Sequence, residues 1–257
     1  MGRVAAGRDV AVEGMLRMDQ DAIVEILKGV STATITTLLL KKGLRNVWMR
    51  GPRPQREGQG RVVGPAFTLR FIPAREDLAT PEAWSSPRST RVAIEEMPPG
   101  CLVVASASGV VDAGIFGDIL CARMIKRQVA GLITDGVVRD IAGVRATGLP
   151  VWSQGTAAPP SATGLIFEGW QQPVGCGGVA VYPGEMIVAD HDGAVVIPAA
   201  HLEHVATAGP EQERLEEWIM REVEKGVPLP GLYPADAATR ARYEAEAGKG
   251  GRHPKAE

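Results

Sequence analysis

The chain has 257 residues, of which 45% are hydrophobic and 23% are charged, and its formal net charge at pH 7 is −2. This length and apolar content suffice for one large domain or two small ones with a substantial core. The balance of 28 basic against 30 acidic residues excludes the strongly basic surface of nucleic-acid-binding domains, and the hydrophobicity excludes a disordered chain. A small-molecule enzyme or a subunit of an assembly fits these numbers best.

The cysteines and the N-terminus indicate where the protein resides. Cys101, Cys121 and Cys176 are too widely spaced for a zinc knuckle or a redox pair, so we interpret them as small buried side chains in a reducing compartment. The first 25 residues include the acidic side chains Asp9, Glu13, Asp19 and Asp21 and contain no apolar h-region, which predicts no signal peptide. No stretch approaches 18 uninterrupted apolar residues. We therefore expect a cytoplasmic protein with neither membrane nor nucleic-acid partners.

The N-terminal part of the chain predicts two short helices followed by a long strand. Residues 18–29 carry an apolar stripe that ends at Gly29, and a second helix begins after Ser31 and runs to Leu40. A loop rich in proline, glycine and charge then covers 50–61. The strand signal extends over 61–72, and residues 73–91 form a polar excursion rich in proline and serine.

The middle of the chain alternates short apolar runs with helical periods. We expect strands at 102–105, at 131–135 and from 150 onward, with helices at 119–128 and 141–147 between them. This order is typical of an α/β layered fold with some parallel strand pairs.

The C-terminal part predicts hairpins, a helix and a tail. Glycine-punctuated apolar runs over 174–198 indicate hairpins, with Asp192-Gly193 as one turn. An amphipathic helix is expected over 210–225, ended by Gly226. Its apolar face consists of Leu215, Trp218, Ile219 and Val223. Residues 235–257 are charged and rich in alanine and glycine, which indicates a mobile tail or an arm that contacts a neighbouring subunit.

Two loops carry the clearest chemical signal. The first, 109–120, contains three glycines and places Asp118 at the start of a helix, where free backbone N–H groups can bind an anion. The second, 134–140, places Arg139 and Asp140 after an apolar strand. Arginine can bind an anionic substrate through two hydrogen bonds, and a carboxylate can hold a hard divalent cation. This combination suits stabilisation of the enolate of a 2-oxo acid. The spacing alone also allows ordinary turn chemistry, with Arg139 and Asp140 paired locally.

A family resemblance extends this interpretation. Asp118, followed after twenty residues by Arg139-Asp140, resembles the Asp-x20-Arg-Asp signature of the 4-hydroxy-4-methyl-2-oxoglutarate aldolase family, which shares its fold with the regulator of ribonuclease activity A. The likeness extends over residues 20–235. Further matching segments occur in the family's order at 31–35, 64–68, 131–140, 183–185 and 189–198.

The resemblance implies a fold and an activity. The fold is a layered α/β, RraA-like domain of the swivelling β/β/α type over 18–235, with mixed sheets and a C-terminal helix, between an N-terminal leader at 1–17 and a charged tail at 236–257. The activity is that of a divalent-metal pyruvate aldolase that also decarboxylates oxaloacetate, acting through a pyruvate enolate. The assembly is a homotrimer or a dimer of trimers.

The resemblance also implies residue roles. Asp140 holds Mg²⁺ or Mn²⁺, largely through waters, and Arg139 binds the pyruvyl oxygens and stabilises the enolate. Asp118 orients a metal-bound water. Glu216, on the C-terminal helix of a neighbouring subunit, is the best match for a further carboxylate at the metal. The substrate carboxylate is received by the backbone amides around Gly117, Asp118, Ile119 and Leu120.

Some positions depart from the family pattern. Thr37 stands where the family has an acidic residue, and the excursion at 73–91 and the tail are additions to its compact form; the identity of the substrate depends on such departures. His201 and His204 could share a helix face as metal ligands, but surface histidines are the simpler interpretation. His191 could bind substrate near a subunit boundary, but a hairpin residue without a role is the simpler interpretation. Arg70 and Arg75 could bind a second substrate carboxylate, but solvated surface arginines are the simpler interpretation.

Two other functions compete with the lyase. A non-catalytic regulator that binds a ribonuclease would use the same trimer as a docking surface, but it would not require Asp118, Arg139 and Asp140 together. A menaquinone methyltransferase would need a glycine pattern for its methyl donor, and the sequence contains no GxGxxG motif.

Overall fold

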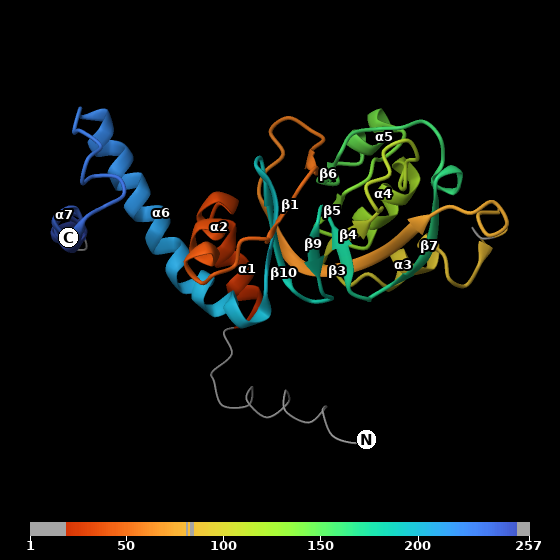
Figure 1. Cartoon of the computed structure of the whole chain (residues 1–257), viewed down its shortest axis with the longest axis horizontal. Helices are drawn as coiled ribbons and strands as arrows, with labels where there is room; N and C mark the ends of the chain where they lie inside the picture. The colour runs from red at the N-terminus through yellow and green to blue at the C-terminus, as the bar shows by residue number, and fades with distance from the viewer. Residues whose placement is uncertain (1–18, 81, 83–84, 251–257) are drawn as a thin grey trace, which may run out of the picture.

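The computed structural model describes residues 19–80, 82 and 85–250, so the leader predicted at 1–17 lies outside the described residues. Helices stand at both ends of the chain around a strand-rich middle (Figure 1). The helices are α1 (Gln20–Lys28), α2 (Thr32–Lys41), α3 (Thr90–Glu96), α4 (Asp118–Lys126), α5 (Ile141–Ala146), α6 (Leu202–Glu224) and α7 (Ala237–Gly250), with short 3₁₀ turns η2 (Ser161–Thr163) and η3 (Ala199–His201). The strands are β1 (Trp48–Met49), β2 (Arg53–Pro54), β3 (Val62–Pro73), β4 (Leu102–Ser106), β5 (Gly131–Thr134), β6 (Val151–Ser153), β7 (Leu165–Trp170), β8 (Val174–Cys176), β9 (Val179–Val181), β10 (Met186–Asp190) and β11 (Gly193–Ile197).

A nine-stranded mixed sheet organises the molecule. Its order is β1-β11-β10-β3-β4-β5-β6-β2, and β7 pairs with β3. The long strand β3 pairs with β10 antiparallel near its start, with β4 parallel in its middle and with β7 antiparallel at its end. Strands β4, β5 and β6 are parallel. The prediction of an α/β fold with mixed sheets and some parallel pairs is therefore confirmed.

The sheet curls on itself. Strands β1 and β2 stand at opposite ends of the strand order, yet only residues 50–52 separate them in the sequence. Inside the curl, the fully buried Trp152 of β6 donates its indole N–H to the carbonyl oxygen of Asp190 on β10, at 2.7 Å. This bond links two strands that are not neighbours in the sheet.

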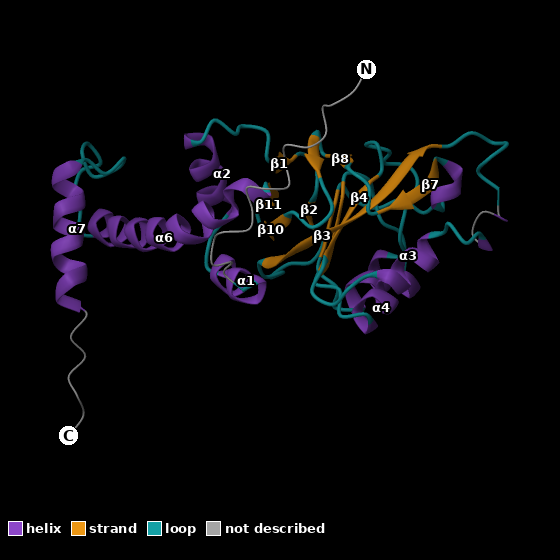
Figure 2. Cartoon of the chain, turned by 90° about the horizontal axis from the view of Figure 1, so that it is seen from below, coloured by secondary structure: helices purple, strands orange, loops and turns teal. Residues whose placement is uncertain are grey.

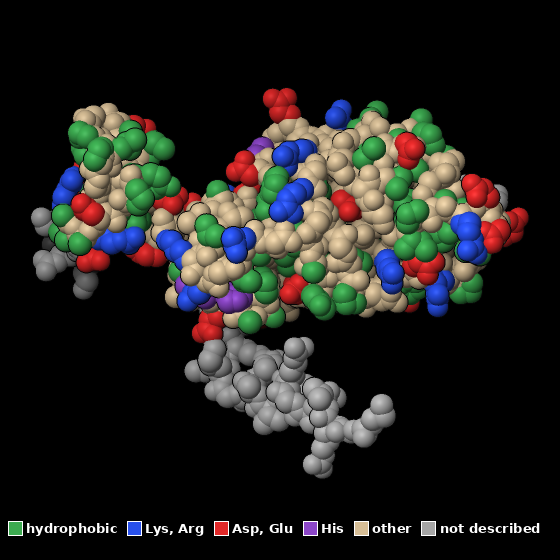
Figure 3. All heavy atoms as spheres, in the orientation of Figure 1, with side chains coloured by type: hydrophobic (Ala, Val, Ile, Leu, Met, Phe, Trp, Pro, Cys, Tyr) green, Lys and Arg blue, Asp and Glu red, His purple; other side chains and the backbone are tan. Residues whose placement is uncertain are grey.

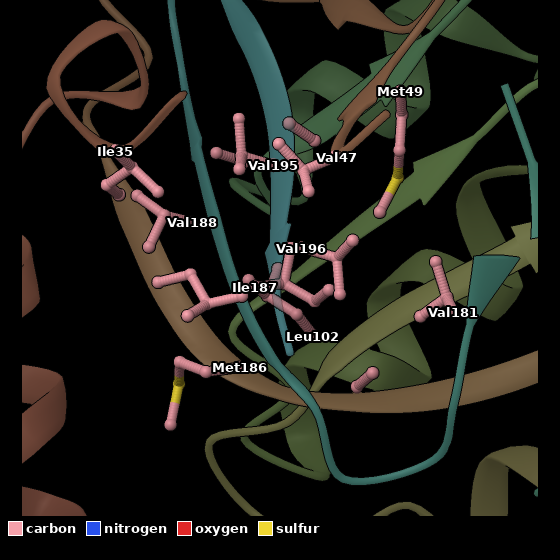
Figure 4. Packing of buried hydrophobic residues seen from close by; sticks show 14 of the residues in the cluster. Ile35, Val47, Met49, Leu102, Val181, Met186, Ile187, Val188, Val195 and Val196 are labelled. Atoms are coloured by element: carbon pink, nitrogen blue, oxygen red, sulfur yellow. The ribbon is translucent and has the colours of Figure 1, made fainter. Parts of the chain in front are cut away.

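Two hydrophobic cores lie on the two faces of the curled sheet. On β4, Leu102 and Val104 point into the core shared with α1, α2 and the β10–β11 hairpin (Figure 4), whereas Val103 and Ala105 point into the core covered by α3, α4 and α5. Figure 2 shows α3 and α4 on one side of the strands. Because both faces are covered, β4 is a continuous apolar run, as is usual for buried parallel strands.

The first two helices begin and end within two residues of the predicted bounds. Asp19 caps α1, which ends at Gly29, and the Ser31 hydroxyl accepts the Thr34 amide at the start of α2. Among the described residues, no single helix is long and apolar enough to cross a membrane. The α1–α2 pair would pass that test by length and composition alone, with a bend of 111° between the two helices.

The C-terminal hairpins are confirmed, with one correction. Strands β8 and β9 pair antiparallel, as do β10 and β11. The turn between β10 and β11 is His191-Asp192, one residue earlier than predicted, and Gly193 already pairs with Asp190. The physical reason is that the Asp190 carboxylate accepts the Asp192 amide at 3.0 Å, which closes the turn at that point.

The C-terminal helix begins earlier than predicted. Helix α6 begins at Leu202 rather than at Pro210, which lies inside it. Val205 and Ala206 are buried, and a Cβ at Gly209 would meet Val30 at 2.8 Å, so close packing against the body of the protein holds the first turns in helical form despite the proline. The outer half of α6 projects from the body as an arm (Figure 1).

The segment predicted only as a charged tail contains helix α7, which packs against this arm. Tyr243 meets Trp218 edge-on at 5.8 Å between ring centroids, and Glu246 accepts the Trp218 indole N–H at 2.8 Å. The buried Glu222 binds both Lys225 and Arg242. Of the predicted apolar face of α6, Leu215, Trp218 and Ile219 are buried in this small core and Val223 is exposed.

Candidate active site

The loops that follow β4 and β5 are joined side by side. The Ile115 amide donates to the Val137 carbonyl at 3.0 Å, and the Arg139 amide donates to the Phe116 carbonyl at 2.9 Å. A further bridge pairs Gly114 with Val137. The structure thereby brings Gly117, Asp118, Arg139 and Asp140, which are distant in sequence, to the adjoining N-terminal ends of α4 and α5. This is the carboxyl edge of the parallel strands, where sites of α/β proteins usually lie.

Two glycines allow the two acidic side chains to approach the opposite helix. A Cβ at Gly117 would lie 2.5 Å from Oδ2 of Asp140, and a Cβ at Gly143 would lie 2.5 Å from Oδ2 of Asp118. Each carboxylate therefore occupies space that only a glycine on the partner helix leaves open. Gly117 could be predicted from the sequence, whereas Gly143 could not, because the need for a glycine at 143 arises only when α4 and α5 pack together.

Arg139 and Asp140 form an ion pair that is open to solvent. Nε of Arg139 lies 3.2 Å from Oδ2 of Asp140, and the two side chains are 35% and 46% exposed. This is the local pairing that the simpler interpretation of the sequence expects. Within the described residues, however, no hydrogen bond occupies the two terminal nitrogens of Arg139 or Oδ1 of Asp140. Both side chains therefore retain hydrogen-bonding capacity toward a ligand.

Asp140 has a left-handed backbone, with φ 52° and ψ 42°. It stands at the N-cap position of α5 but its side chain makes no capping hydrogen bond. Aspartate is one of the few residues other than glycine that adopt this conformation at modest cost. The carboxylate consequently points toward Arg139 and Gly117 instead of closing its own helix.

The N-terminus of α4 offers backbone amides next to this pair. Gly117 is its N-cap and provides no side-chain cap. Four backbone amides are predicted to bind a substrate carboxylate. One of them, the amide of Ile119, already donates a hydrogen bond to Oδ1 of Asp118 at 2.7 Å. The amides of Gly117, Asp118 and Leu120 have no partner within the described chain. An anion placed there would also meet the positive end of the helix dipole.

Glu216 lies apart from the other predicted site residues within one chain. It is on α6, where its carboxylate accepts a hydrogen bond from the side-chain Nε2 of Gln212 at 2.7 Å, and the arm is well separated from α4 and α5 (Figure 1). Across the residues that the structure describes, no group of three or more His, Cys, Asp or Glu side chains could hold a metal ion. A metal at Asp140 would therefore be bound mainly by waters, or by groups from another chain.

Asp135 is a structural residue of this region that was not among the predicted site residues. Its buried carboxylate accepts the Ala107 amide at 2.6 Å and the Gly177 amide at 3.2 Å. Burial raises the pKa of Asp135, and the backbone hydrogen bonds offset only part of that rise. The residue ties the loops after β4 and β5 to the β8–β9 hairpin. An aspartate directly after the apolar strand, in Thr134-Asp135-Gly136, is the signal that could have identified it.

The other candidate residues lie elsewhere on the surface. His191 is exposed in its hairpin turn, and His201 and His204 lie half-buried at the start of α6. The pKa of His204 is lowered, mainly by burial and to a smaller extent by the nearby charges of Lys42 and His201. Arg75 is exposed and pairs with Asp77 at 2.7 Å. Arg70 is exposed as well.

The three cysteines are free and buried, as predicted. Burial raises the pKa of both Cys101 and Cys121 to about 12, and it raises the pKa of Cys176 strongly. They therefore lack the thiolate character of catalytic cysteines.

The fold and the paired loops define a class of α/β protein with a curled mixed sheet and a site at the N-termini of two helices. The family model described as "RraA-like: Aldolase/RraA" matches residues 30–196. The chain therefore belongs to the Aldolase/RraA family, as the sequence motifs predict.

Individual relatives agree with this assignment. A provisionally named 4-hydroxy-4-methyl-2-oxoglutarate aldolase of Halalkalibacterium halodurans is 31% identical over 167 residues, which are 65% of this chain and 73% of the relative. Protein DlpA of Legionella pneumophila is 28% identical over 69% of this chain, but the match spans only 28% of DlpA.

Solved structures share the fold. Streptomyces coelicolor RraAS2, described as an unusual member of the RNase ES inhibitor RraA protein family, superposes with a TM-score of 0.70 at 35% identity, covering 79% of this chain and 98% of that one. An uncharacterised Pseudomonas syringae protein superposes with a TM-score of 0.74 over 88% of this chain and 100% of its own, and at 24% identity it supports the fold alone.

Proposed function

We propose that the chain is a cytoplasmic, divalent-metal-dependent lyase that cleaves or decarboxylates 2-oxo acids through a pyruvate enolate, acting as a 4-hydroxy-4-methyl-2-oxoglutarate aldolase and an oxaloacetate decarboxylase. The observation that carries the proposal is the meeting of Arg139, Asp140 and the free amides of α4 at one place. The names of the aldolase relatives support the substrate class. The three free, buried thiols suit a reducing compartment.

The chain's own residues account for recognition of the pyruvyl group. The unoccupied amides at the start of α4 receive the substrate carboxylate, and the terminal nitrogens of Arg139 bind the adjacent oxygens. When the C–C bond breaks, negative charge develops on the 2-oxo oxygen. The Arg139 guanidinium, fixed by its ion pair with Asp140, stabilises that charge without having to reorient.

The residues present fit a magnesium or manganese ion. Asp140 offers a half-exposed carboxylate with one oxygen free of hydrogen bonds within the described chain, and Asp118 lies across the same helix ends. Mg²⁺ prefers oxygen ligands and is commonly held by one or two carboxylates while it keeps several waters. Asp140 would hold the ion, Asp118 would orient one of its waters, and Glu216 of a neighbouring subunit would add a carboxylate. When bound, the ion polarises the 2-oxo group.

A trimer or a dimer of trimers completes the proposal. Next to the site, Ile119 is 80% exposed and Val111 is 52% exposed. Hydrophobic side chains also gather on the arm and the segment that follows it (Figure 3), where Met220 of α6 and Leu229 and Tyr233 beyond it are exposed. Exposed apolar surface at these two places is typical of contacts between subunits. The partner's arm would thus supply Glu216 to the site.

The test follows pyruvate release from oxaloacetate with Mg²⁺ or Mn²⁺, after subtraction of the metal-catalysed background without protein. Arg139→Ala and Asp140→Asn should each lower kcat/KM by about 100-fold, because each removes a charge at the reacting centre. Arg123→Ala is the matched arginine control, since Arg123 is exposed on α4 and binds Glu95. Asp21→Asn on α1 is the matched aspartate control. Full turnover in both site variants, or no metal-dependent turnover on any pyruvyl substrate, would reject the mechanism.

A second candidate function is a regulator that binds a ribonuclease. It is favoured by the 35% identity with RraAS2, whose family is described as inhibiting RNase ES. Addition of the chain to an RNase E-type ribonuclease would then slow RNA cleavage, and Arg139→Ala would leave that inhibition intact because docking does not use the site. Inhibition together with absent lyase turnover would assign this second function.

A further inference from the structure

A cavity of about 180 Å³ lies between the excursion that follows β3 and the strand β7. Its floor is apolar and includes Phe71, Leu165 and Phe167, of which Phe71 and Leu165 are buried. The two phenylalanine rings meet edge-on at 5.1 Å between centroids, so the floor is a fixed aromatic surface. Pockets of this kind bind the apolar part of a small molecule.

The rim of this cavity is polar and carries positive charge. The described lining includes Arg88 and Arg91 together with the hydroxyl groups of Ser86 and Ser161, and it includes no aspartate or glutamate. The guanidinium of Arg88 makes no hydrogen bond with any other described residue. A cation with free donors above an aromatic floor favours an anion that also has a compact apolar body.

The cavity is distinct from the candidate active site and shares no residue with it. The turn η2, which lines the cavity, lies between the two. Before η2, the Pro159 carbonyl accepts the Gly114 amide of the α4 loop at 2.9 Å; after η2, the Gly164 carbonyl accepts the Ala74 amide at 2.9 Å. These two bonds connect the turn that lines the cavity to the α4 loop on one side and to the segment after β3 on the other.

We propose that this cavity is a second ligand site, specific for a small carboxylic acid with an aromatic or branched apolar body. The carboxylate binds Arg88 and the rim hydroxyls, and the apolar body rests on Phe71, Leu165 and Phe167. Neither the charge alone nor the apolar body alone suffices for binding, because the rim is exposed to water and the cavity is small.

Isothermal titration calorimetry with three probes tests the proposal. 3-Phenylpropionate has both features, 3-phenylpropanol lacks the charge, and acetate lacks the apolar body. 3-Phenylpropionate should bind saturably. 3-Phenylpropanol and acetate should each bind about tenfold more weakly or worse, because the alcohol loses a charged hydrogen bond and acetate loses the ring. Equal binding of the alcohol and the acid would overturn the proposal.

Variants locate the binding. Arg88→Gln should weaken 3-phenylpropionate binding about tenfold, and Ala79→Trp, which fills the cavity from its lining, should abolish it. The matched control is Arg75→Gln, an exposed arginine of the same excursion outside the lining. Arg139→Ala should leave binding unchanged. If Arg139→Ala removes binding, or if Arg88→Gln binds as tightly as Arg75→Gln, the probe occupies another site and the proposal fails.

Discussion

Gly117 and Gly143 determine how closely Asp140 and Asp118 approach the ends of the opposite helices. Each glycine faces a carboxylate oxygen at 2.5 Å from the position that a Cβ would take. Gly117 has a φ of −111°, which any residue can adopt, so its requirement for glycine is steric and comes from Asp140.

Substitution of Gly117 by alanine should therefore damage the site more than the fold. The added methyl group displaces the Asp140 carboxylate, and a shift of about 1 Å at such a position can cost on the order of 100-fold in rate. We expect kcat/KM for pyruvate release to fall at least about tenfold while the melting temperature changes little. Gly60→Ala is the control, because a Cβ there meets open space. Unchanged activity in Gly117→Ala would show that the position of Asp140 does not limit the reaction.

The cysteines allow a second test at single residues. Because burial raises the pKa of Cys101 and Cys121 to about 12, roughly one thiol in ten thousand is ionised at pH 8. The native protein should react slowly with a thiol reagent such as dithionitrobenzoate, and three equivalents should react once urea unfolds the chain. Rapid labelling of the native protein would show that a thiol becomes exposed by local opening.

The sequence predicts the reactive side chains of the site better than it predicts the residues that position them. Arg139 and Asp140 follow an apolar strand at a spacing that indicates a site, and the structure places both beside Gly117. Gly143 has no such pattern, because its contact with Asp118 arises only when α4 and α5 pack together. Asp135 does follow an apolar strand, but the amides of Ala107 and Gly177 that it binds reach it only in the folded protein, so the linear pattern does not indicate its role.

At the scale of the elements, carboxylates on α6 and β10 bind the backbone amides at the start of α2. The Glu213 carboxylate accepts the Ser31 amide at 2.7 Å, and the buried Asp190 accepts the Thr32 amide at 2.9 Å. Burial raises the pKa of Glu213, but hydrogen bonds from Ser31 and Thr34 and the nearby charge of Arg61 outweigh this and lower it. The ionised carboxylate is therefore the form that binds α2.

Removal of this carboxylate should reduce stability in a pH-dependent way. Glu213→Ala should lower the free energy of unfolding by about 1–2 kcal/mol at pH 7, as expected for a charge-assisted hydrogen bond. A lowered pKa means that this contribution is present above the ordinary value of 4.5 and is lost as the pH falls through the lowered value. Urea unfolding at pH 7 and below pH 4 measures this effect. The difference in the free energy of unfolding between wild type and Glu213→Ala should be smaller below pH 4 than at pH 7.

Glu217→Ala is the matched control for that experiment, because Glu217 is an exposed glutamate on the same helix whose one ion pair within the described residues is with Arg221. Its effect at pH 7 should stay below about 0.5 kcal/mol. Equal losses in the two variants would show that Glu213 does not fasten the arm.

Local patterns predict most elements of the body and the outer half of α6, but not the first turns of α6 or helix α7. The alternation of strands and helices from β4 to β6 follows directly from apolar runs and helical periods. In contrast, Pro210 resembles the first residue of a helix, and packing of Gly209 against Val30 overrides that signal. Helix α7 is rich in charge and alanine, and it depends on contacts with Trp218 and Glu222 that its own sequence does not indicate.

At the scale of the whole molecule, a single charged substitution on the arm should disrupt the proposed trimer or hexamer. Met220 is 60% exposed on an apolar surface, so Met220→Glu should convert a trimer or hexamer into monomers by sedimentation velocity, with circular dichroism unchanged. Lyase activity should fall with it, because the proposed site needs Glu216 from a neighbour. Leu78→Glu, at an exposed leucine of the excursion after β3, is the control. A wild-type monomer, or an unaltered oligomer in Met220→Glu, would contradict this arrangement.

The long strand β3 has a consequence for how the protein loses its structure. It forms hydrogen bonds with β10 in one half and with β4 and β7 in the other, and its residues Val63 and Phe67 belong to the two different cores. Neither core can melt without releasing the backbone that the other requires. The body of the protein should therefore unfold as one cooperative unit, and damage to either face of the sheet is shared by both.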